Sequence, residues 1–147
     1  MLEVLPGATV VRTAWVYTGS SGTDFAAVMA RKARAGEPVD VVDDQTGSPT
    51  YVGDLVGALL RIADAGVSAP VVHAANTGGA SRFDQARAVY AAVGADVNLV
   101  RPVGSAAHPR PAPRPGYSVL GARLSQAAGL PPLRPWADAL AHALSGS

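Results

Sequence analysis

The sequence has 147 residues, of which 48% are hydrophobic and 16% are charged, and its formal net charge is +1. This length is typical of one domain, and the hydrophobic content allows a buried core, which argues against a disordered tail. The near-neutral charge lacks the long-range field of a nucleic-acid binder, so no nucleic-acid partner is expected. The absence of cysteine excludes disulfides, thiolate catalysis and a thiolate zinc site.

The sequence also shows no pattern typical of a membrane-spanning segment or of an export signal. No stretch approaches the roughly 20 apolar residues that span a bilayer. The first residues carry no basic segment ahead of a long apolar run, so no secretory signal is indicated. We therefore expect a cytoplasmic protein without a membrane partner.

The first third of the chain predicts a strand, a helix and a second strand. Residues 8–17 are rich in β-branched and aromatic side chains and predict one buried strand. The GSSG segment that follows is interpreted as an ordinary turn. Helical spacing of apolar residues then predicts a helix over 23–35, and a short strand is predicted at 39–42.

The middle of the chain continues the alternation. Residues 45–51 are predicted to be a loop because they are rich in Gly, Ser and Pro. A strand is predicted at 70–75, and Ser81 with Asp84 predicts the capped start of a further helix. One apolar stripe indicates a helix over residues 52–65 with this face in the core: Val52, Leu55, Val56, Leu59, Leu60 and Ala63.

A short strand at 98–103, a proline-rich loop at 104–116 and two short helices near 121–128 and 135–144 complete the prediction. Strands alternating with helices indicate α/β architecture. We expect the last strands of a doubly wound parallel, Rossmann-like sheet, together with a small α/β substrate-binding lobe.

Several catalytic motifs are absent. No segment has the GxGxxG spacing that brings backbone amides to a dinucleotide pyrophosphate. Lys32 is the only lysine, and it follows no tyrosine at the Tyr-x-x-x-Lys spacing of short-chain reductases. The histidines lack metal-ligand spacing, and His73 in an apolar strand is interpreted as a satisfied core residue. We therefore predict no catalytic residue and no metal ligand in this chain.

Four motifs in a fixed order carry a resemblance to a known family. They are RTAWVY (12–17), VVDDQTGSPTYVGDL (41–55), AANTGGAS (74–81) and PRPAPRPGYSVL (109–120). Together they resemble the dTDP-4-dehydrorhamnose reductase family of extended short-chain dehydrogenases/reductases, and most closely its actinobacterial branch. The likeness covers roughly residues 9–144.

The resemblance implies that residues 1–147 are a single unit, the substrate-binding carboxyl-terminal part of an NAD(P)-dependent reductase whose amino-terminal cofactor-binding part is absent. In this family NADPH reduces the 4-keto group of dTDP-6-deoxy-L-lyxo-4-hexulose to give dTDP-L-rhamnose. The isolated chain is expected to be inactive because the glycine motif and the Tyr-x-x-x-Lys pair are missing. Some relatives use Mg²⁺ at a dimer contact, which leaves a homodimer and Mg²⁺ open here, with no ligand assigned.

The family motifs also suggest individual site residues. Trp15 would lay its ring against the hexose, or else be a core tryptophan, and Thr13 would touch the nicotinamide end of the cofactor, or else pack in the strand. Gln45 would make polar contacts from its loop, or else belong to a demanding turn. Arg114 would bind the diphosphate, and Tyr117 would line the same pocket or anchor the loop.

Two rival hypotheses stay open at this point. The regulatory β subunit of methionine adenosyltransferase resembles this family and acts mainly by binding a partner enzyme, so a non-catalytic role is an alternative. The chain could also fail to fold alone, since removing neighbouring strands from a parallel sheet exposes an apolar edge.

Overall fold

The segment predicted as one strand over residues 8–17 is divided in the structure. A computed structural model describes residues 7–64, 66–67, 69–107, 111–112 and 114–145. Strand β1 (Val10–Arg12) pairs in parallel with β6 (Val71–His73), whereas β2 (Val16–Tyr17) pairs in parallel with β5 (Thr50–Tyr51). Between them, Trp15 has a φ of 47°, the left-handed region that a bulky residue rarely adopts. The chain therefore leaves one strand pair and enters another.

The remaining strands also form pairs. Parallel pairs join β3 (Val39–Val42) to β9 (Val100–Val103) and β7 (Asn76–Thr77) to β10 (Leu133–Pro135), and β4 (Thr46–Gly47) is antiparallel to β8 (Ala80–Ser81). The α/β prediction is confirmed. The prediction of a loop over 45–51 was wrong, because β4 and β5 lie inside it and pair with partners remote in sequence.

The predicted helices are present, with bounds that are shortened or shifted by one or two residues. Helix α1 (Phe25–Arg34) begins after Asp24, whose carboxylate accepts a hydrogen bond from the Ala27 amide. Ser81 and Asp84 form the predicted capping box of α3. The full set of helices is α1, α2 (Val52–Asp64), α3 (Arg82–Ala92), α4 (Arg123–Ala127) and α5 (Trp136–Ser145), with 3-10 turns at Val97–Leu99 and Ser105–Ala107.

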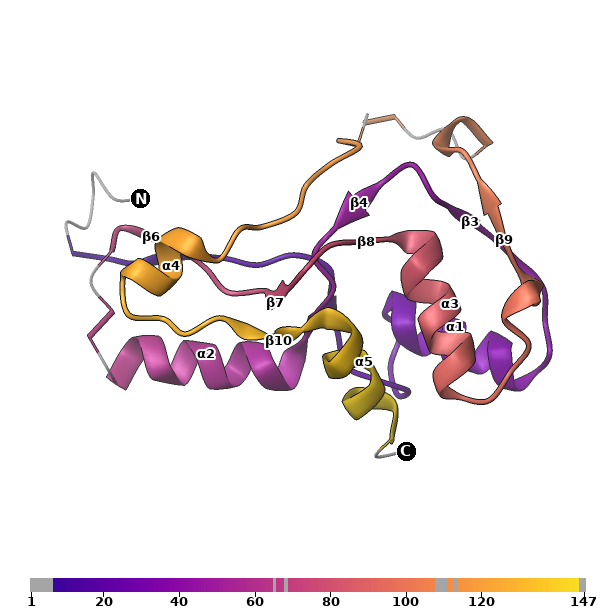
Figure 1. The fold of residues 1–147 in the computed structure, drawn as a ribbon, viewed down its shortest axis with the longest axis horizontal. Helices are drawn as coiled ribbons and strands as arrows, with labels where there is room; N and C mark the ends of the chain where they lie inside the picture. Colours follow the sequence, from indigo (N-terminus) through magenta and orange to yellow (C-terminus); the bar gives the residue numbers. More distant parts are fainter. Residues whose placement is uncertain (1–6, 65, 68, 108–110, 113, 146–147) are drawn as a thin grey trace.

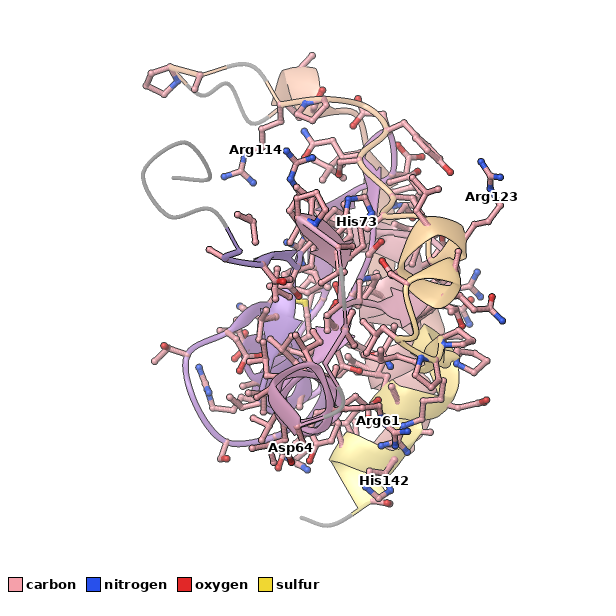
Figure 2. All side chains as sticks on the ribbon, turned by 90° about the vertical axis from the view of Figure 1, so that its left-hand side faces the viewer. Arg61, Asp64, His73, Arg114, Arg123 and His142 are labelled. Atoms are coloured by element: carbon pink, nitrogen blue, oxygen red, sulfur yellow. The ribbon has the colours of Figure 1, made fainter. Side chains whose placement is uncertain are left out.

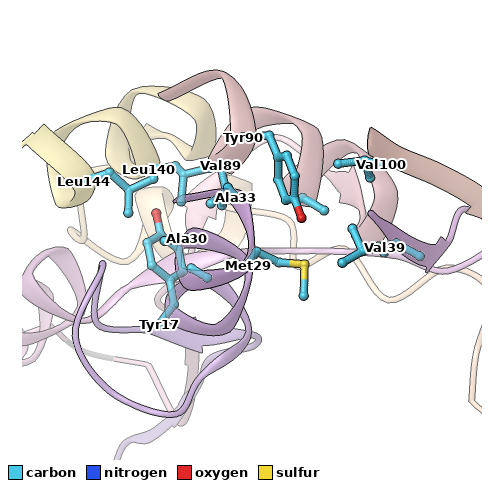
Figure 3. Packing of buried hydrophobic residues seen from close by; sticks show 13 residues of the cluster. Tyr17, Met29, Ala30, Ala33, Val39, Val89, Tyr90, Val100, Leu140 and Leu144 are labelled. Atoms are coloured by element: carbon cyan, nitrogen blue, oxygen red, sulfur yellow. The ribbon is translucent and has the colours of Figure 1, made fainter. Parts of the chain in front are cut away.

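The described chain is elongated and has a core at each end (Figure 1). At one end, α2 and α4 lie beside β6, around a small cluster that includes Ala58, Val72 and Leu130. At the other end, α1, α3 and α5 pack with β3 and β9 around a larger cluster. Figure 3 shows part of it, with Tyr17 near Leu140 and Tyr90 near Val100.

One polar network ties α2 to β10. The Arg134 guanidinium donates two hydrogen bonds to the Asp54 carboxylate, at 2.6 and 2.8 Å, and holds the pKa of that carboxyl below its usual value. The buried Asn76 side chain donates to Asp54 and accepts from the Tyr51 amide. The network therefore fixes β5, the strand at the end of the DDQTGSPTY segment.

Helix α2 does not bury the predicted stripe. Val56, Leu59 and Leu60 are 48%, 42% and 61% exposed, and Ala58 is the buried residue of this helix. An apolar stripe is buried only where another element packs on it, and no element in the described ranges covers this side of α2. The sequence prediction of a core position for these three residues was wrong. No helix in the described chain is long and apolar enough to cross a membrane.

A matched pair of leucines tests this difference in burial. Leu140→Ala removes a side chain that is 1% exposed, so we expect it to lower the free energy of unfolding by about 2–5 kcal/mol. Leu60→Ala should change it by less than about 0.5 kcal/mol, because the side chain is already in solvent. Urea denaturation followed by circular dichroism measures both, and equal losses would contradict the exposed position of Leu60.

Candidate functional site

A cavity of about 240 Å³ brings together residues from distant parts of the chain. It is lined by Trp15, Gln45, Arg82, Arg114, Pro115 and Ser118. Three of these were singled out from the sequence, at separations of 30 and 69 residues along the chain (15 to 45 and 45 to 114). The structure therefore places an indole, an amide and a guanidinium around one concave surface.

Strand β4 organises this cavity. Gln45 directly precedes β4, and Arg82 directly follows β8, its antiparallel partner. On the other side of β4, the Thr46 amide donates to the Gly116 carbonyl, and the Ser118 amide donates to the Thr46 carbonyl, both at 2.8 Å. The segment carrying Arg114 is therefore held by backbone hydrogen bonds beside Gln45.

The Trp15 indole is held between two neighbours. A Cβ atom at Gly47 would lie 2.5 Å from two ring carbons, so the glycine backbone lies directly against the ring. The Arg82 guanidinium carbon lies 3.7 Å from the ring centroid. Two groups this close to the ring centre cannot share one face, so they cover opposite faces. Gly47 and Arg82 therefore cover the indole from both sides, and the contact of Trp15 with a hexose stays a prediction. No hydrogen-bond acceptor for the indole N–H occurs among the described residues.

Arg82 was missed by the sequence analysis. It is the first residue of α3, and its aromatic contacts come from segments that are distant in sequence. In the structure it is half-buried, stacks on Trp15 and lies 4.8 Å from the Phe25 ring centroid. It also donates to the buried Gln85 side-chain oxygen at 3.0 Å. Burial, and then the nearby positive charge of Arg114, lower the pKa of Arg82 to about 10, so it remains a cation at neutral pH.

Arg114 supplies a second positive charge from an exposed position. Figure 2 shows it at the end of the molecule opposite Asp64 and His142. In the described part of the chain, neither Arg82 nor Arg114 forms an ion pair. The Asp44 carboxylate, close in sequence to Gln45, accepts instead from the Ser105 amide and hydroxyl, each at 2.8 Å. The cavity therefore has a net positive charge that suits an anion.

The other sequence candidates lie outside this cavity. Thr13 is exposed between β1 and β2, and its predicted contact with a cofactor stays a prediction. The Tyr117 side chain is 73% exposed, while its backbone bridges to Thr46. Tyr117 thus anchors the loop to β4, and its contact with a substrate stays a prediction.

His73, which the sequence predicts to be a satisfied core residue, has partners in the structure. His73 Nδ1 lies 3.0 Å from the Gly121 carbonyl oxygen, and the His73 amide donates to Ser125 Oγ. No group of three potential metal ligands occurs among the described residues.

A second, larger cavity is lined in part by the Asp54–Arg134 pair. It has a volume of about 310 Å³ and opens between α2 and the segment before α5. Its lining includes Asp54, Arg61 and Arg134, of which Asp54 and Arg134 pair with each other. Because Asp54 and Arg134 neutralise each other, Arg61 is the one unpaired cation named in this lining, compared with two in the first cavity. The first cavity is therefore the better site for an anion.

Comparison with known proteins decides the family. The model of the RmlD substrate binding domain matches residues 1–147. This chain belongs to the RmlD substrate binding domain family. It is 60% identical over 145 residues to a dTDP-4-dehydrorhamnose reductase of Mycolicibacterium smegmatis, covering 99% of this chain and 44% of that protein. It is 62% identical over 145 residues to the reductase of Mycobacterium tuberculosis, covering 99% of this chain and 48% of that protein.

Solved structures of RmlD-type reductases agree with the fold. The dTDP-4-dehydrorhamnose reductase of Bacillus anthracis in complex with NADP is similar with a TM-score of 0.85 and 31% identity, over 95% of this chain and 48% of that chain. The chain spans about half the length of the relatives it matches. The family resemblance and the Rossmann-like fold class predicted from the sequence are thereby confirmed.

The contact between Gly47 and Trp15 gives a direct test of the site geometry. Gly47→Ala must displace the indole, so we expect the free energy of unfolding to fall by about 1–3 kcal/mol through overpacking. Gly57→Ala is the matched control, because a Cβ atom at this position in α2 meets open space. The substitution should leave the free energy of unfolding unchanged or raise it by up to about 1 kcal/mol. Urea denaturation of the two variants measures this, and similar effects would contradict the packed indole.

Proposed function

We propose that this chain is the sugar-nucleotide-binding part of a dTDP-4-dehydrorhamnose reductase. In the complete enzyme, NADPH would reduce the 4-keto group of dTDP-6-deoxy-L-lyxo-4-hexulose to give dTDP-L-rhamnose. The observation that carries the proposal is the cationic cavity in which Trp15, Gln45 and Arg114 meet. High identity to proteins named as this reductase supports the substrate class.

The chemistry of the cavity fits such a ligand. A sugar nucleotide has a diphosphate with two or more negative charges, and a guanidinium donates paired hydrogen bonds to phosphate oxygens. The Gln45 amide has no hydrogen-bond partner among the described residues and so can both donate to and accept from a pyrimidine or a sugar hydroxyl. The Trp15 N–H offers one further donor at the edge of the indole.

The sequence lacks the two motifs of a complete cofactor site. The chain has no glycine-rich dinucleotide motif, and Lys32, its only lysine, pairs with Glu37 at 2.8 Å. We propose that residues 1–147 act as a single substrate-binding unit and that a separate cofactor-binding segment carries NADPH and the Tyr-x-x-x-Lys pair. The complex of the Bacillus anthracis relative with NADP supports NADPH as the family cofactor. Thr13 is the residue that we propose to approach its nicotinamide end.

Two exposed surfaces suit contact with such a segment. Within the described chain, β1 pairs with β6 alone, which leaves its other edge available for a further parallel strand. The exposed residues Val56, Leu59 and Leu60 lie on α2 at the same end of the molecule (Figure 1). We propose that the cofactor-binding segment extends the sheet at β1.

The regulatory role considered from the sequence is not supported, because the curated relatives reported above are reductases by name. A homodimer, a cytoplasmic location and the absence of nucleic-acid partners stay predictions. Mg²⁺ is not proposed.

Activity and binding assays on the purified chain test the proposal. We expect no steady oxidation of NADPH with dTDP-6-deoxy-L-lyxo-4-hexulose, because the hydride and proton donors lie outside this chain. We expect saturable one-to-one binding of dTDP in isothermal titration calorimetry. Steady turnover by the chain alone would contradict the proposal that a separate segment carries the cofactor and the Tyr-x-x-x-Lys pair. Failure of a folded chain to bind dTDP would contradict the proposed substrate class.

A further inference from the structure

The cavity contains a cation, Arg82, that the sequence did not reveal. Arg82 is half-buried, yet no carboxylate in the described ranges pairs with it. Its neighbours on the protein side are the Trp15 ring at 3.7 Å, the Phe25 ring at 4.8 Å and the Gln85 oxygen at 3.0 Å. Aromatic faces and one amide oxygen offset only part of the lost hydration of a guanidinium.

The second guanidinium increases this imbalance. Arg114 lines the same cavity and acts on Arg82 as a like charge. Two cations that share a partly buried cavity repel each other, and the repulsion is relieved when an anion enters between them. An anion with two charged groups can accept hydrogen bonds from both.

We infer that Arg82 is the second diphosphate-binding residue of this site and that it acts together with Arg114. The inference rests on the proposed function and names a residue beyond it. Arg82 lies on one face of the indole and lines the cavity, while Gly47 lies against the other face of the ring. The Trp15 ring and the Gln85 side-chain oxygen therefore both hold the guanidinium in place at the cavity.

This arrangement makes the site selective for the number of phosphates. A ligand with two phosphate groups can accept from both guanidinium groups, whereas a monophosphate reaches one of them. The Arg82 guanidinium is already held by the Trp15 ring and by the Gln85 oxygen, so fewer of its side-chain conformations are lost on binding. The expected signature is a preference for dTDP over dTMP that depends on the charge of Arg82.

Calorimetric titration of the purified chain with dTDP, dTMP and NADPH tests this. In Arg82→Gln we expect the affinity for dTDP to fall at least about tenfold and the affinity for dTMP to fall less, so that the ratio of the two shrinks. Arg87→Gln is the matched control. It removes an arginine from the same helix, one that lies 5.6 Å from the Phe83 ring centroid and outside the cavity, and it should leave both affinities unchanged.

The ratio separates ligand contact from a structural role. A variant that merely loosens the cavity, or that is only partly folded, weakens dTDP and dTMP alike and leaves their ratio as in the wild type. Arg82→Met keeps a long side chain on the indole without the charge. If Arg82→Gln does not fold, the ratio of the dTDP and dTMP affinities is measured in Arg82→Met instead, and the same decrease is expected.

Each outcome bears on a different claim. An unchanged ratio in Arg82→Gln or Arg82→Met, with dTDP bound by the wild type, overturns the role of Arg82 and leaves the proposed function standing. No binding of dTDP by the folded wild type overturns the proposed function and the inference with it. Binding of NADPH that equals dTDP and falls in parallel in Arg82→Gln shows a diphosphate site that serves the cofactor, which contradicts the assignment to the sugar nucleotide.

Discussion

The left-handed backbone of Trp15 is the constraint on which this structure depends. At a φ of 47°, the chain leaves β1, turns, and enters β2, so the two strands belong to different pairs. A bulky residue in this region is strained by roughly 1–3 kcal/mol, and such strain persists only where packing holds it. Here the glycine at position 47 allows the ring to lie against the backbone, and Arg82 covers the other face. Packing at the cavity thus offsets the backbone strain of Trp15 and fixes the orientation of its indole ring.

The second feature is a charge arrangement that is incomplete within the described chain. Three cations elsewhere in the described chain have carboxylate partners: Arg134 with Asp54, Arg101 with Asp40, and Lys32 with Glu37. Arg82 and Arg114 instead line one cavity, neither has such a partner among the described residues, and the nearby Asp44 accepts from Ser105. A protein surface with this pattern is stabilised by an anionic ligand, which supports the sugar-nucleotide ligand that we propose.

The sequence predicted what local chemistry and family motifs determine. The capping box of Ser81 and Asp84 was confirmed because it depends on residues three apart. The meeting of Trp15, Gln45 and Arg114 followed from motifs of a resembling family. By contrast, the short strand β4 and the stacking of Arg82 depend on pairing between segments far apart in sequence, which no local pattern encodes. The prediction that the apolar stripe of α2 is buried was wrong for Val56, Leu59 and Leu60. An apolar helix face in a sequence indicates that the face can pack against another element, but it does not show that such an element is present.

A crystal structure of the chain with dTDP tests the central claim most directly, because it shows where the phosphates lie. We expect the diphosphate between the guanidinium groups of Arg82 and Arg114, with Gln45 within hydrogen-bonding distance of the nucleotide and the Trp15 ring still against Gly47. A nucleotide found in the cavity beside Arg61 and Arg134, or on a surface remote from Trp15, would contradict the account.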